Sequence, residues 1–440
     1  MIRVPWMATA LAAGLLFASL CVGPTPLNAQ NSLDADRGGQ ARRKSPEMLL
    51  NRLDTDGDGQ VSRDEWQKPE KLFNRIDSNG DGVLTLQELQ ALDVLSPKQG
   101  STAVKWIDVH VHPSTGRLPK PDAKGTLEAA LSVMDSNQIS LMVLMPQPMI
   151  NEKRNGKVLP PAPVERWIDE ARKYPDRFVV MGGGGSLNSM IHDESADGHP
   201  SEGLKKRFAE RAEAILEMGA VGFGELAILH LSMVPGQQLM DVPADHPLLL
   251  MLSDIAAKHD VVIDVHFDLV REDIPRPDYL SDENPAVLKR NLDGFERFLE
   301  HNRDAKICWA HVGSDRLSFW TAEFTREMLA KHPNLYMSLR LFPSKSGLNY
   351  PLTENGITAE WMETFTQYPD RFFIGGDQFF VPPALSRNDG PGARFARQSQ
   401  DTRDHVNLFL GYLPPEIAKK FAFENTVRVY KLTDSAQVAR

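Results

Sequence analysis

The chain has 440 residues, 41% of them hydrophobic, and a formal net charge of −10 at pH 7. This length exceeds one ordinary small domain and suits a large domain joined to a smaller one. The acidic balance argues against nucleic-acid binding, which needs a basic surface, and leaves no polybasic patch for a membrane surface. A small-molecule substrate is the remaining expectation, and nothing in the composition indicates an oligomeric state.

An apolar segment begins the chain. Residues 1–29 carry one charged side chain, Arg3, and the run MATALAAGLLFASLCVG is followed by small and turn-forming residues. This pattern is typical of a secretory signal peptide cleaved after Ala29, and an uncleaved anchor is the alternative. We therefore expect export to the periplasm or the cell exterior, with no membrane span after cleavage. Loss of Cys21 leaves Cys308 as the only cysteine, so no intramolecular disulfide is expected.

Two acidic loops come next. DTDGDGQVSRDE at 54–65 and DSNGDGVLTLQE at 77–88 match the EF-hand calcium loop position by position. Gly59 and Gly82 stand where this loop turns sharply, and hard oxygen ligands suit Ca²⁺. An acidic surface loop is the alternative, but two complete loops in tandem favour calcium. We expect a small all-α module over 45–93, with calcium ligands at Asp54, Asp56, Asp58, Gln60, Ser62, Glu65, Asp77, Asn79, Asp81, Val83, Thr85 and Glu88.

The remainder alternates short apolar runs with segments of helical periodicity. Eight strands, each followed by a helix, fit a (β/α)8 TIM barrel, an α/β fold. A doubly wound open sheet is the alternative, but no glycine-rich dinucleotide motif follows the first strand. GGGG at 182–185 indicates close backbone approach near a site. Strands are expected at 106–112, 140–146, 178–185, 221–228, 261–268, 306–313, 335–340 and 372–379, helices at 127–137, 164–175, 205–219, 247–260 and 414–432, and long connections at 186–203, 228–245, 268–286 and 378–404.

Polar side chains stand at the C-terminal ends of these strands, where active sites of such barrels form. In WIDVHVHP, alternation predicts a common face for Asp108, His110 and His112. Two histidines at a strand end are candidate metal ligands. Glu225, His266, His311, Arg340 and Asp377 end later strands, and alternation pairs Phe223 with Glu225, Asp264 with His266, Trp309 with His311, and Gly375 with Asp377.

Imidazole and carboxylate ligands suit one or two divalent transition-metal ions such as Zn²⁺ or Mn²⁺. A bound metal would lower the pKa of a water molecule, which then attacks the substrate. With two ions Glu225 is the candidate bridge, and Asp377 would also accept the proton of the attacking water. The expected metal ligands are His110, His112, Glu225, His266, His311 and Asp377, and the expected catalytic residues are Asp377, His311 and Arg340.

Some of these residues have alternative roles. With a single ion, His311 becomes an acid or electrophile, and Glu225 becomes a hydrogen-bond acceptor outside the ligand set. Arg340 either binds a substrate carboxylate or phosphate or forms an ion pair. Asp108 and Asp264 are expected below the metals, outside the ligand set. His192, His199, His230 and His246 are expected in loops or helix starts, and most of them are expected to be solvated.

The chain resembles the amidohydrolase superfamily, and more narrowly the amidohydrolase-related group that contains decarboxylases and lactone hydrolases. The resemblance covers roughly residues 104–432 and is carried by IDVHVHP, YPDRFVVMGG, GAVGFGEL, VVIDVHFD, WAHVG, HPNLYMSL, RFFIGGDQF and FENTVRVY. It implies a metal-dependent barrel. The mononuclear pattern of that family matches His110, His112, His266 and Asp377, and Glu225 and His311 complete its binuclear pattern.

One departure from the family concerns the bridge. Phosphotriesterase-like members often use a carboxylated lysine, whereas the fourth strand here has none, so Glu225 must serve if there are two metals. Decarboxylases of the group typically lack this glutamate, which favours hydrolysis.

Three functions are compatible with the sequence. The first is an exported metal-dependent hydrolase acting on a small ester, lactone, amide or phosphoester, with a calcium-binding accessory module. The second is a metal-dependent non-oxidative decarboxylase of an aromatic or unsaturated acid. The third is a catalytically silent calcium-dependent binding protein. In each case the expected segments are a signal peptide at 1–29, linkers at 30–44 and 94–103, an EF-hand module at 45–93 and the barrel at 104–440.

Overall fold

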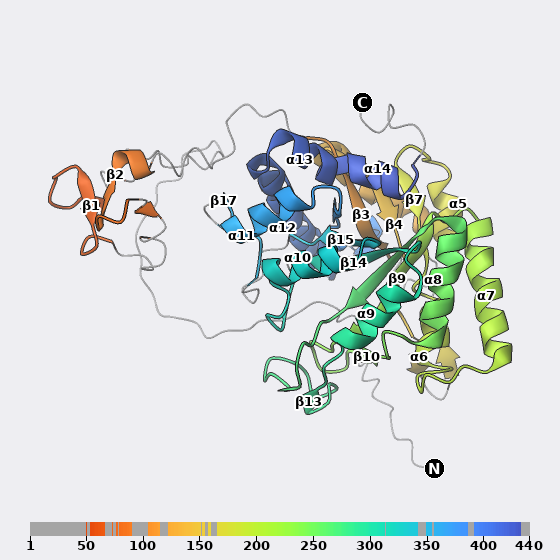
Figure 1. Ribbon diagram of the computed structural model, residues 1–440. Coiled ribbons are helices and arrows are strands. Elements are labelled where there is room, and N and C mark those ends of the chain that lie inside the picture. The colour runs from red at the N-terminus through yellow and green to blue at the C-terminus, as the bar shows by residue number, and fades with distance from the viewer. Residues whose placement is uncertain are drawn as a thin grey trace, which may run out of the picture.

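The structure is a computed structural model (Figure 1), and it describes residues 50, 53–66, 73, 76–77, 79–89, 104–114, 122–150, 152–154, 157–159, 165–312, 314–341, 349–353, 356–385 and 391–432. The expected signal peptide and both expected linkers lie outside these ranges. None of the helices found within them is both long enough and apolar enough to cross a membrane.

A short antiparallel strand pair joins the two acidic loops. β1 (Gln60–Ser62) pairs with β2 (Val83–Thr85), with Val61 opposite Leu84. The expectation of an all-α module is therefore wrong in this respect. In both strands a buried residue stands between two less buried ones, which is the alternation of a half-buried strand. The core of the module is formed by Leu50, Val61, Trp66, Phe73, Ile76, Leu84 and Leu89.

Mostly parallel strands form the centre of the larger domain, in two sheets. The four-stranded sheet has the order β19 (Gln378–Phe380), β3 (Trp106–Pro113), β4 (Ile139–Leu144) and β7 (Phe178–Val180). The seven-stranded sheet has the order β10 (Met240–Asp241), β9 (Gly222–His230), β11 (Val262–Phe267), β14 (Lys306–Val312), β15 (Leu335–Leu339) and β18 (Phe372–Ile374), with β8 (Gly182–Gly183) beside β9. A strand is present in each of the eight expected ranges, but the ranges 178–185 and 372–379 are each divided between two strands, β7 and β8 in the first and β18 and β19 in the second. The domain has a TIM-barrel-like α/β fold.

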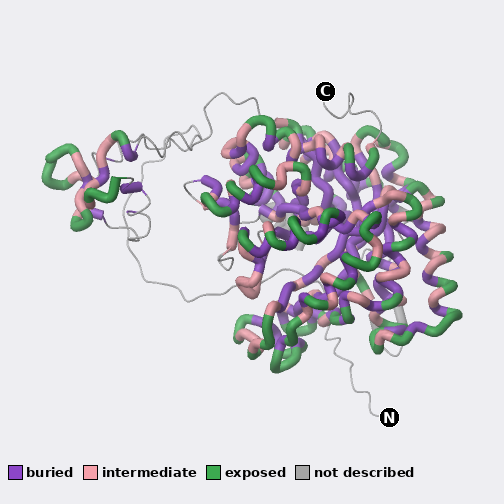
Figure 2. The backbone as a smooth tube through the Cα atoms, viewed as in Figure 1, coloured by how far each residue is buried: buried purple, intermediate pink, exposed green. Residues whose placement is uncertain are grey.

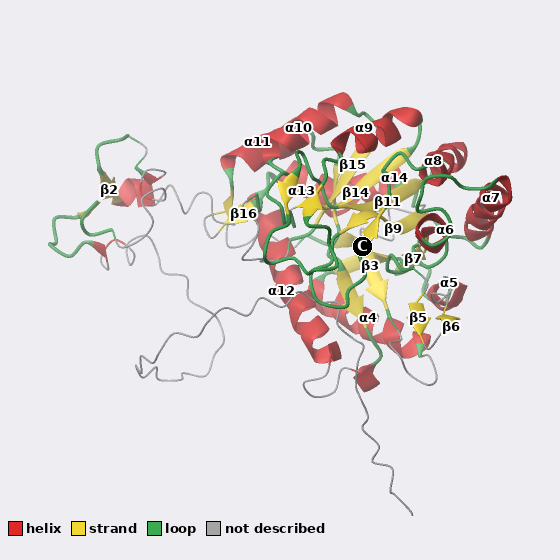
Figure 3. Cartoon of the chain, turned by 90° about the horizontal axis from the view of Figure 1, so that it is seen from below, coloured by secondary structure: helices red, strands yellow, loops and turns green. Residues whose placement is uncertain are grey.

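Helices lie outside the strands (Figure 3). Three of them begin at Ser201, Thr321 or Thr358, whose hydroxyls accept a hydrogen bond from the backbone N–H three residues further on. The helices are α4 (Ala123–Asn137), α5 (Glu165–Ala171), α6 (Leu187–His192), α7 (Glu202–Glu217), α8 (Pro247–His259), α9 (Leu292–His301), α10 (Ala322–Lys331), α11 (Ala359–Gln367), α12 (Pro391–Tyr412), α13 (Pro415–Lys419) and α14 (Asn425–Val429), with a π-helical turn at Lys420–Glu424.

Buried residues concentrate in the strands and on the helix faces that cover them (Figure 2). The larger core packs the strands against the helices, where Trp309 stacks on Trp320 at a centroid distance of 3.8 Å. A smaller core includes Cys308, which is buried as a small apolar residue. The other buried residues of this smaller core are Ile107, Val109, Leu141, Val143, Met145, Met181, Val262, Phe373, Val429 and Tyr430.

Between Asp108 and Val111, β3 contains one extra residue relative to β4. Asp108 pairs with Met142 and Val111 with Leu144, so three steps along β3 match two along β4. A bulge of this kind reverses the alternation of side chains. Asp108 and Val111 therefore share a face, and the expected common face of Asp108 with the two histidines of the strand is wrong.

β9 and β14 contain equivalent irregularities. The stretch from Phe223 to Leu226 matches two steps of β11, and the stretch from Trp309 to Val312 matches two steps of β15. All four residues pack in the larger core between strands and helices. The expected common faces of Phe223 with the glutamate of its strand, and of Trp309 with the histidine of its strand, are therefore wrong. Both polar side chains turn away from that core.

Candidate metal centre

Glu225 lies at the centre of a cluster of four imidazoles. Its Oε2 is 3.1 Å from His112 Nε2 and 3.5 Å from His110 Nε2. Its Oε1 is 2.9 Å from His266 Nδ1 and 3.1 Å from His311 Nε2. The two carboxylate oxygens therefore face two different pairs of histidines, one pair on β3 and the other on β11 and β14.

Asp377 joins the cluster from the turn between β18 and β19. Its Oδ1 is 3.3 Å from His112 Nε2, and its Oδ2 is 3.0 Å from Arg340 Nη2. Arg340 also donates to Ser314 Oγ at 3.1 Å. Asp377 and His311 have positive φ angles of 49° and 78°, a conformation that costs a residue other than glycine about 1–3 kcal/mol. Strain at two polar residues of one cluster favours a functional role for them.

Contacts outside the cluster orient the histidines of β3. His112 Nδ1 lies 3.1 Å from the Met145 carbonyl oxygen, which accepts its proton, and His110 Nδ1 lies 3.3 Å from Asp264 Oδ1. Protons held on Nδ1 leave Nε2 of both rings for a metal. These two Nε2 atoms are 3.1 Å apart, a spacing at which two acceptor nitrogens need a proton or a metal ion between them. Asp264 and His266 share a face, as alternation predicts.

The charges of the cluster favour a cation. Burial lowers the pKa of His112, but hydrogen bonds to Asp377 and Glu225 raise it overall to about 9. Burial raises the pKa of Glu225, but the charge of His110 holds it well below its usual range. Burial lowers the pKa of His311 to about 3, so this ring is a neutral ligand. A divalent metal would supply the positive charge that the two carboxylates favour.

The donor set therefore fits a divalent transition metal. The structure brings together all six residues that the sequence predicts as ligands. Two overlapping groups have ligand atoms within 4.8 Å of one another, and each could hold an ion. The first group is His110, Glu225 and His311, and the second is His110, His112 and Asp377.

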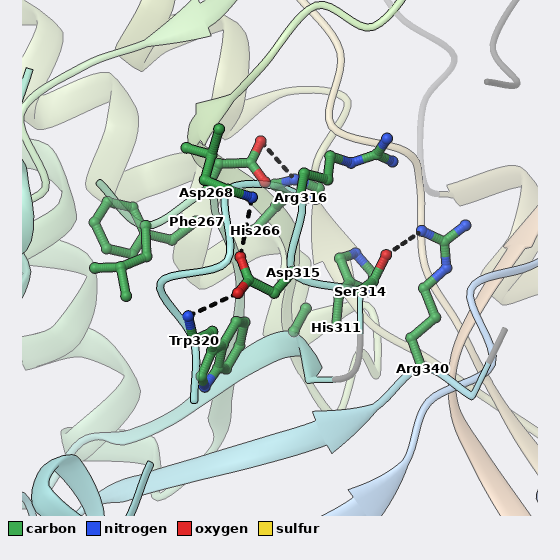
Figure 4. A pocket seen from close by; sticks show the side chains of 12 residues that line it. His266, Phe267, Asp268, His311, Ser314, Asp315, Arg316, Trp320 and Arg340 are labelled. Carbon is green, nitrogen blue, oxygen red and sulfur yellow. Dashed lines mark hydrogen bonds and ion pairs between the residues drawn. The ribbon is translucent and has the colours of Figure 1, made fainter. Parts of the chain in front are cut away.

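A pocket opens beside the cluster (Figure 4). His266 and His311 of the metal centre line it, and so does the predicted catalytic residue Arg340. Substrate bound there would touch the metal centre directly. The remaining lining residues are Phe267, Asp268, Leu269, Ala310, Ser314, Asp315, Arg316, Leu317 and Trp320.

Some residues near the centre were missed or misplaced by sequence reasoning. Asp268 lies 3.5 Å from His266 Nε2, and its place two residues after that histidine was the available signal. His230, expected in a solvated loop, ends β9, and its ring centroid lies 4.2 Å from that of His266. Burial and then the charge of His266 lower the pKa of His230 to about 4. His246 lies at a helix start, as expected, but it is buried, and it accepts the N–H of Leu248 at the start of α8.

The acidic loops of the N-terminal module converge as calcium ligands do. Oxygens of Asp54, Asp56 and Glu65 lie within 4.8 Å of one another. Glu65 accepts hydrogen bonds from the backbone and hydroxyl of Ser62, at 2.8 Å each, and these lower its pKa to about 2. Glu88 accepts the equivalent pair from Thr85 in the second loop. The Glu65 carboxylate is thus held ionised at the last ligand position of its loop.

The family model described as amidohydrolase matches residues 107–432, a segment that contains all six predicted metal ligands. The chain belongs to the amidohydrolase family. The EF hand model matches residues 48–68 and 70–93. Family membership supports a metal-dependent activity of hydrolase or decarboxylase type, and the EF-hand matches support calcium binding.

Among solved structures, the chain is similar to 4-oxalomesaconate hydratase from Rhodopseudomonas palustris, with 13% identity over 75% of this chain and 97% of that one and a TM-score of 0.38. It is similar to aminofutalosine deaminase from Helicobacter pylori, with 9% identity over 76% and 82% and a TM-score of 0.39. An amidohydrolase from Pseudomonas aeruginosa gives 10% identity over 78% and 99% and a TM-score of 0.38. A search of curated proteins finds no match.

Proposed function

We propose that this protein is a metal-dependent hydrolase that acts on a small ester, lactone, amide or phosphoester. The main observation behind the proposal is that each carboxylate oxygen of Glu225 faces a different pair of histidines, at distances of 2.9–3.5 Å. A carboxylate placed in this way is suited to bridge two cations, and paired ions are common in hydrolytic sites. A single-ion decarboxylase has no need of that bridge. We also propose that the two sheets belong to one closed barrel.

The proposed ligand set is His110, His112, Glu225, His266, His311 and Asp377. A divalent metal bound there would acidify a water molecule and polarise the bond to be cleaved. Asp377 accepts the proton of the attacking water and returns it to the leaving alcohol or amine. Arg340, 3.0 Å from Asp377, holds that carboxylate ionised and in place. The ring of His311 is neutral, so it is available as a ligand and has no positive charge that would repel a cation.

The remaining parts of the proposal concern location and calcium. The apolar N-terminus supports export, so the protein would act in the periplasm or outside the cell. Calcium is more abundant there, and loops of this kind in extracellular modules bind it with modest affinity. The N-terminal module would then stabilise the enzyme only after export.

The test combines metal analysis with turnover. The mature full-length chain is loaded with Zn²⁺ or Mn²⁺, its metal content is measured, and a panel of small esters, lactones, amides and phosphoesters is assayed. Asp377→Asn should lower kcat by about 10²- to 10⁴-fold. Asp293→Asn, an exposed residue of α9 paired with Arg290, is the control and should leave kcat unchanged. Release of carbon dioxide without consumption of water would replace hydrolysis by decarboxylation, and ligand binding without turnover would show a binding protein.

A further inference from the structure

Two arginines stand beside the metal centre in the same pocket. Arg340 follows β15, and Arg316 lies on the loop after β14. Figure 4 shows that both side chains extend toward the same side of the pocket, with Ser314 beside Arg340. Burial lowers the pKa of Arg316, Asp268 raises it, and the neighbouring charge of Arg340 lowers it again. The two guanidinium groups thus lie on one side of the pocket.

The loop that carries Arg316 is held in place by hydrogen bonds. Asp315 accepts the backbone N–H of Leu317 at 3.1 Å and of Trp320 at 2.8 Å. The Tyr279 hydroxyl donates to the carbonyl oxygen of Arg316 at 2.6 Å. The guanidinium of Arg316 is therefore presented from a backbone that is fixed before any ligand binds, which lowers the ordering cost of recognition.

The carboxylates near the two arginines are shared with the metal centre. Asp377 lies 3.0 Å from Arg340 and 3.3 Å from His112. Asp268 lies 3.5 Å from the ligand histidine His266. When metal cations occupy the cluster, these carboxylates face positive charge on two sides. The two carboxylates would then be shared between the arginines and the metal cations.

We propose that the substrate carries an anionic group, a carboxylate or a phosphoryl group, which Arg316 and Arg340 bind while its scissile bond faces the metal centre. This inference rests on the hydrolase function proposed above and narrows its substrate class. Planar guanidinium groups match both kinds of oxyanion. Phe267, Leu317 and Trp320 line the rest of the pocket and would contact a short apolar body between the anionic group and the scissile bond.

A matched substrate pair tests the proposal. Monomethyl succinate and methyl butyrate differ only by a carboxylate in place of a methyl group, and methyl 3-phosphonopropanoate replaces the carboxylate by a phosphonate. The metal-loaded enzyme should prefer one of the two anionic esters to methyl butyrate by about 10- to 100-fold in kcat/KM, the range for hydrogen bonds to a charged group. The anionic ester that the enzyme prefers shows whether the site recognises a carboxylate or a phosphoryl group.

Arg316→Met should remove this preference by raising KM for the anionic ester about 10- to 100-fold more than it raises KM for methyl butyrate. Arg316→Lys keeps the positive charge but not the planar guanidinium group, so it should retain part of the preference for the anionic ester. Arg297→Met is the control, because Arg297 is exposed on α9 and paired with Asp245, away from the pocket residues. Metal content and unfolding temperature are measured for each variant, so that loss of the fold is not read as loss of recognition.

Binding measurements distinguish the proposed anion site from the proposed hydrolase function. Succinate and inorganic phosphate are titrated calorimetrically into the wild type and Arg316→Met, with and without metal. Equal kcat/KM for neutral and anionic esters, unchanged in Arg316→Met, would overturn the anion site and leave the hydrolase. No turnover of any ester, but oxyanion binding that is lost in Arg316→Met, would keep the anion site and overturn the hydrolase. Oxyanion binding that is absent, or that does not depend on Arg316, would overturn the anion site.

Discussion

Asp108 accepts a hydrogen bond from the backbone N–H of Gly376 at 2.8 Å, although the two residues are 268 positions apart in the chain. The same carboxylate accepts the backbone N–H of His110 at 3.1 Å and a hydrogen bond from the Gln378 side chain. One buried side chain thus connects the strand of the two histidines to the turn that carries Asp377.

Replacing Asp108 by Asn should loosen this connection. An amide can accept through only one atom, so at least one of the three hydrogen bonds is lost and the turn of Asp377 gains freedom. We expect transition-metal affinity to fall by about 10- to 100-fold, as for other residues that support ligands. Metal titration measures this, with Asp293→Asn as the control. Wild-type affinity in Asp108→Asn would show that the turn is held by other contacts.

Glu225→Gln tests the bridge. The amide keeps the size of the side chain but loses the charge that two cations share. We expect about two transition-metal ions per wild-type chain and about one in the variant, measured by elemental analysis. Glu202→Gln, an exposed change on α7, should leave the metal content unchanged. One ion in the wild type would place Glu225 outside the ligand set and favour the decarboxylase.

Calcium should stabilise the N-terminal module. In the full-length chain, calcium is expected to slow proteolysis within residues 45–93 and to raise the temperature at which this segment becomes susceptible. The double variant Glu65→Gln and Glu88→Gln removes the last ligand of each loop and should abolish both effects. A protease-resistance profile that chelation of calcium leaves unchanged in the wild type would contradict a stabilising role.

Gly184 shows why the glycine run at 182–185 is needed. A Cβ at this position would lie 2.5 Å from the Pro146 carbonyl oxygen and 2.6 Å from that of Glu225, both of which are backbone atoms. We expect Gly184→Ala to lower the free energy of unfolding by about 1–3 kcal/mol, because the backbone must shift. A Cβ at Gly203 in α7 would meet only the Ser201 hydroxyl, at 4.0 Å, so Gly203→Ala should raise the free energy of unfolding by about 0.4–1 kcal/mol. Denaturant unfolding measures both changes.

Asp260 should contribute a pH-dependent part of stability. Its carboxylate lies 2.6 Å from Lys306 Nζ and 2.5 Å from Lys431 Nζ, and these contacts lower its pKa. A lowered folded-state pKa gives stability above the unfolded-state pKa that is lost as pH falls toward the folded-state value. Since the residue is half exposed, the effect is below about 1 kcal/mol. Asp260→Asn is a suitable change because asparagine tolerates the φ of 53° at this position. The variant should show a weaker dependence of the free energy of unfolding on pH below about pH 4. Unfolding midpoints of the wild type and the variant are measured between pH 3 and 7. The same dependence of the midpoint on pH in both proteins would contradict the prediction.

The sequence predicts where the strands follow one another along the chain, and it predicts the six residues that cluster at the site. Both predictions rest on a local pattern, an apolar run that ends in His, Glu or Asp. The faces of Asp108, Phe223 and Trp309 could not be predicted, since a bulge is decided by pairing with a neighbouring strand. α12 occupies much of the region expected as a connection at 378–404, and its polar sequence gave a weak apolar stripe. The position of His230 against the ring of His266 likewise depends on a residue distant in the sequence.

The three bulges have a consequence for how the site tolerates change. His110, Glu225 and His311 each lie within the irregular stretch of their strand, so their direction depends on how many residues the stretch contains. A substitution in such a stretch alters one side chain. Deletion of a single residue would restore regular alternation and direct an ionisable group into the apolar layer beneath the helices. The metal centre therefore constrains the length of these strands as strictly as it constrains the identity of its ligands.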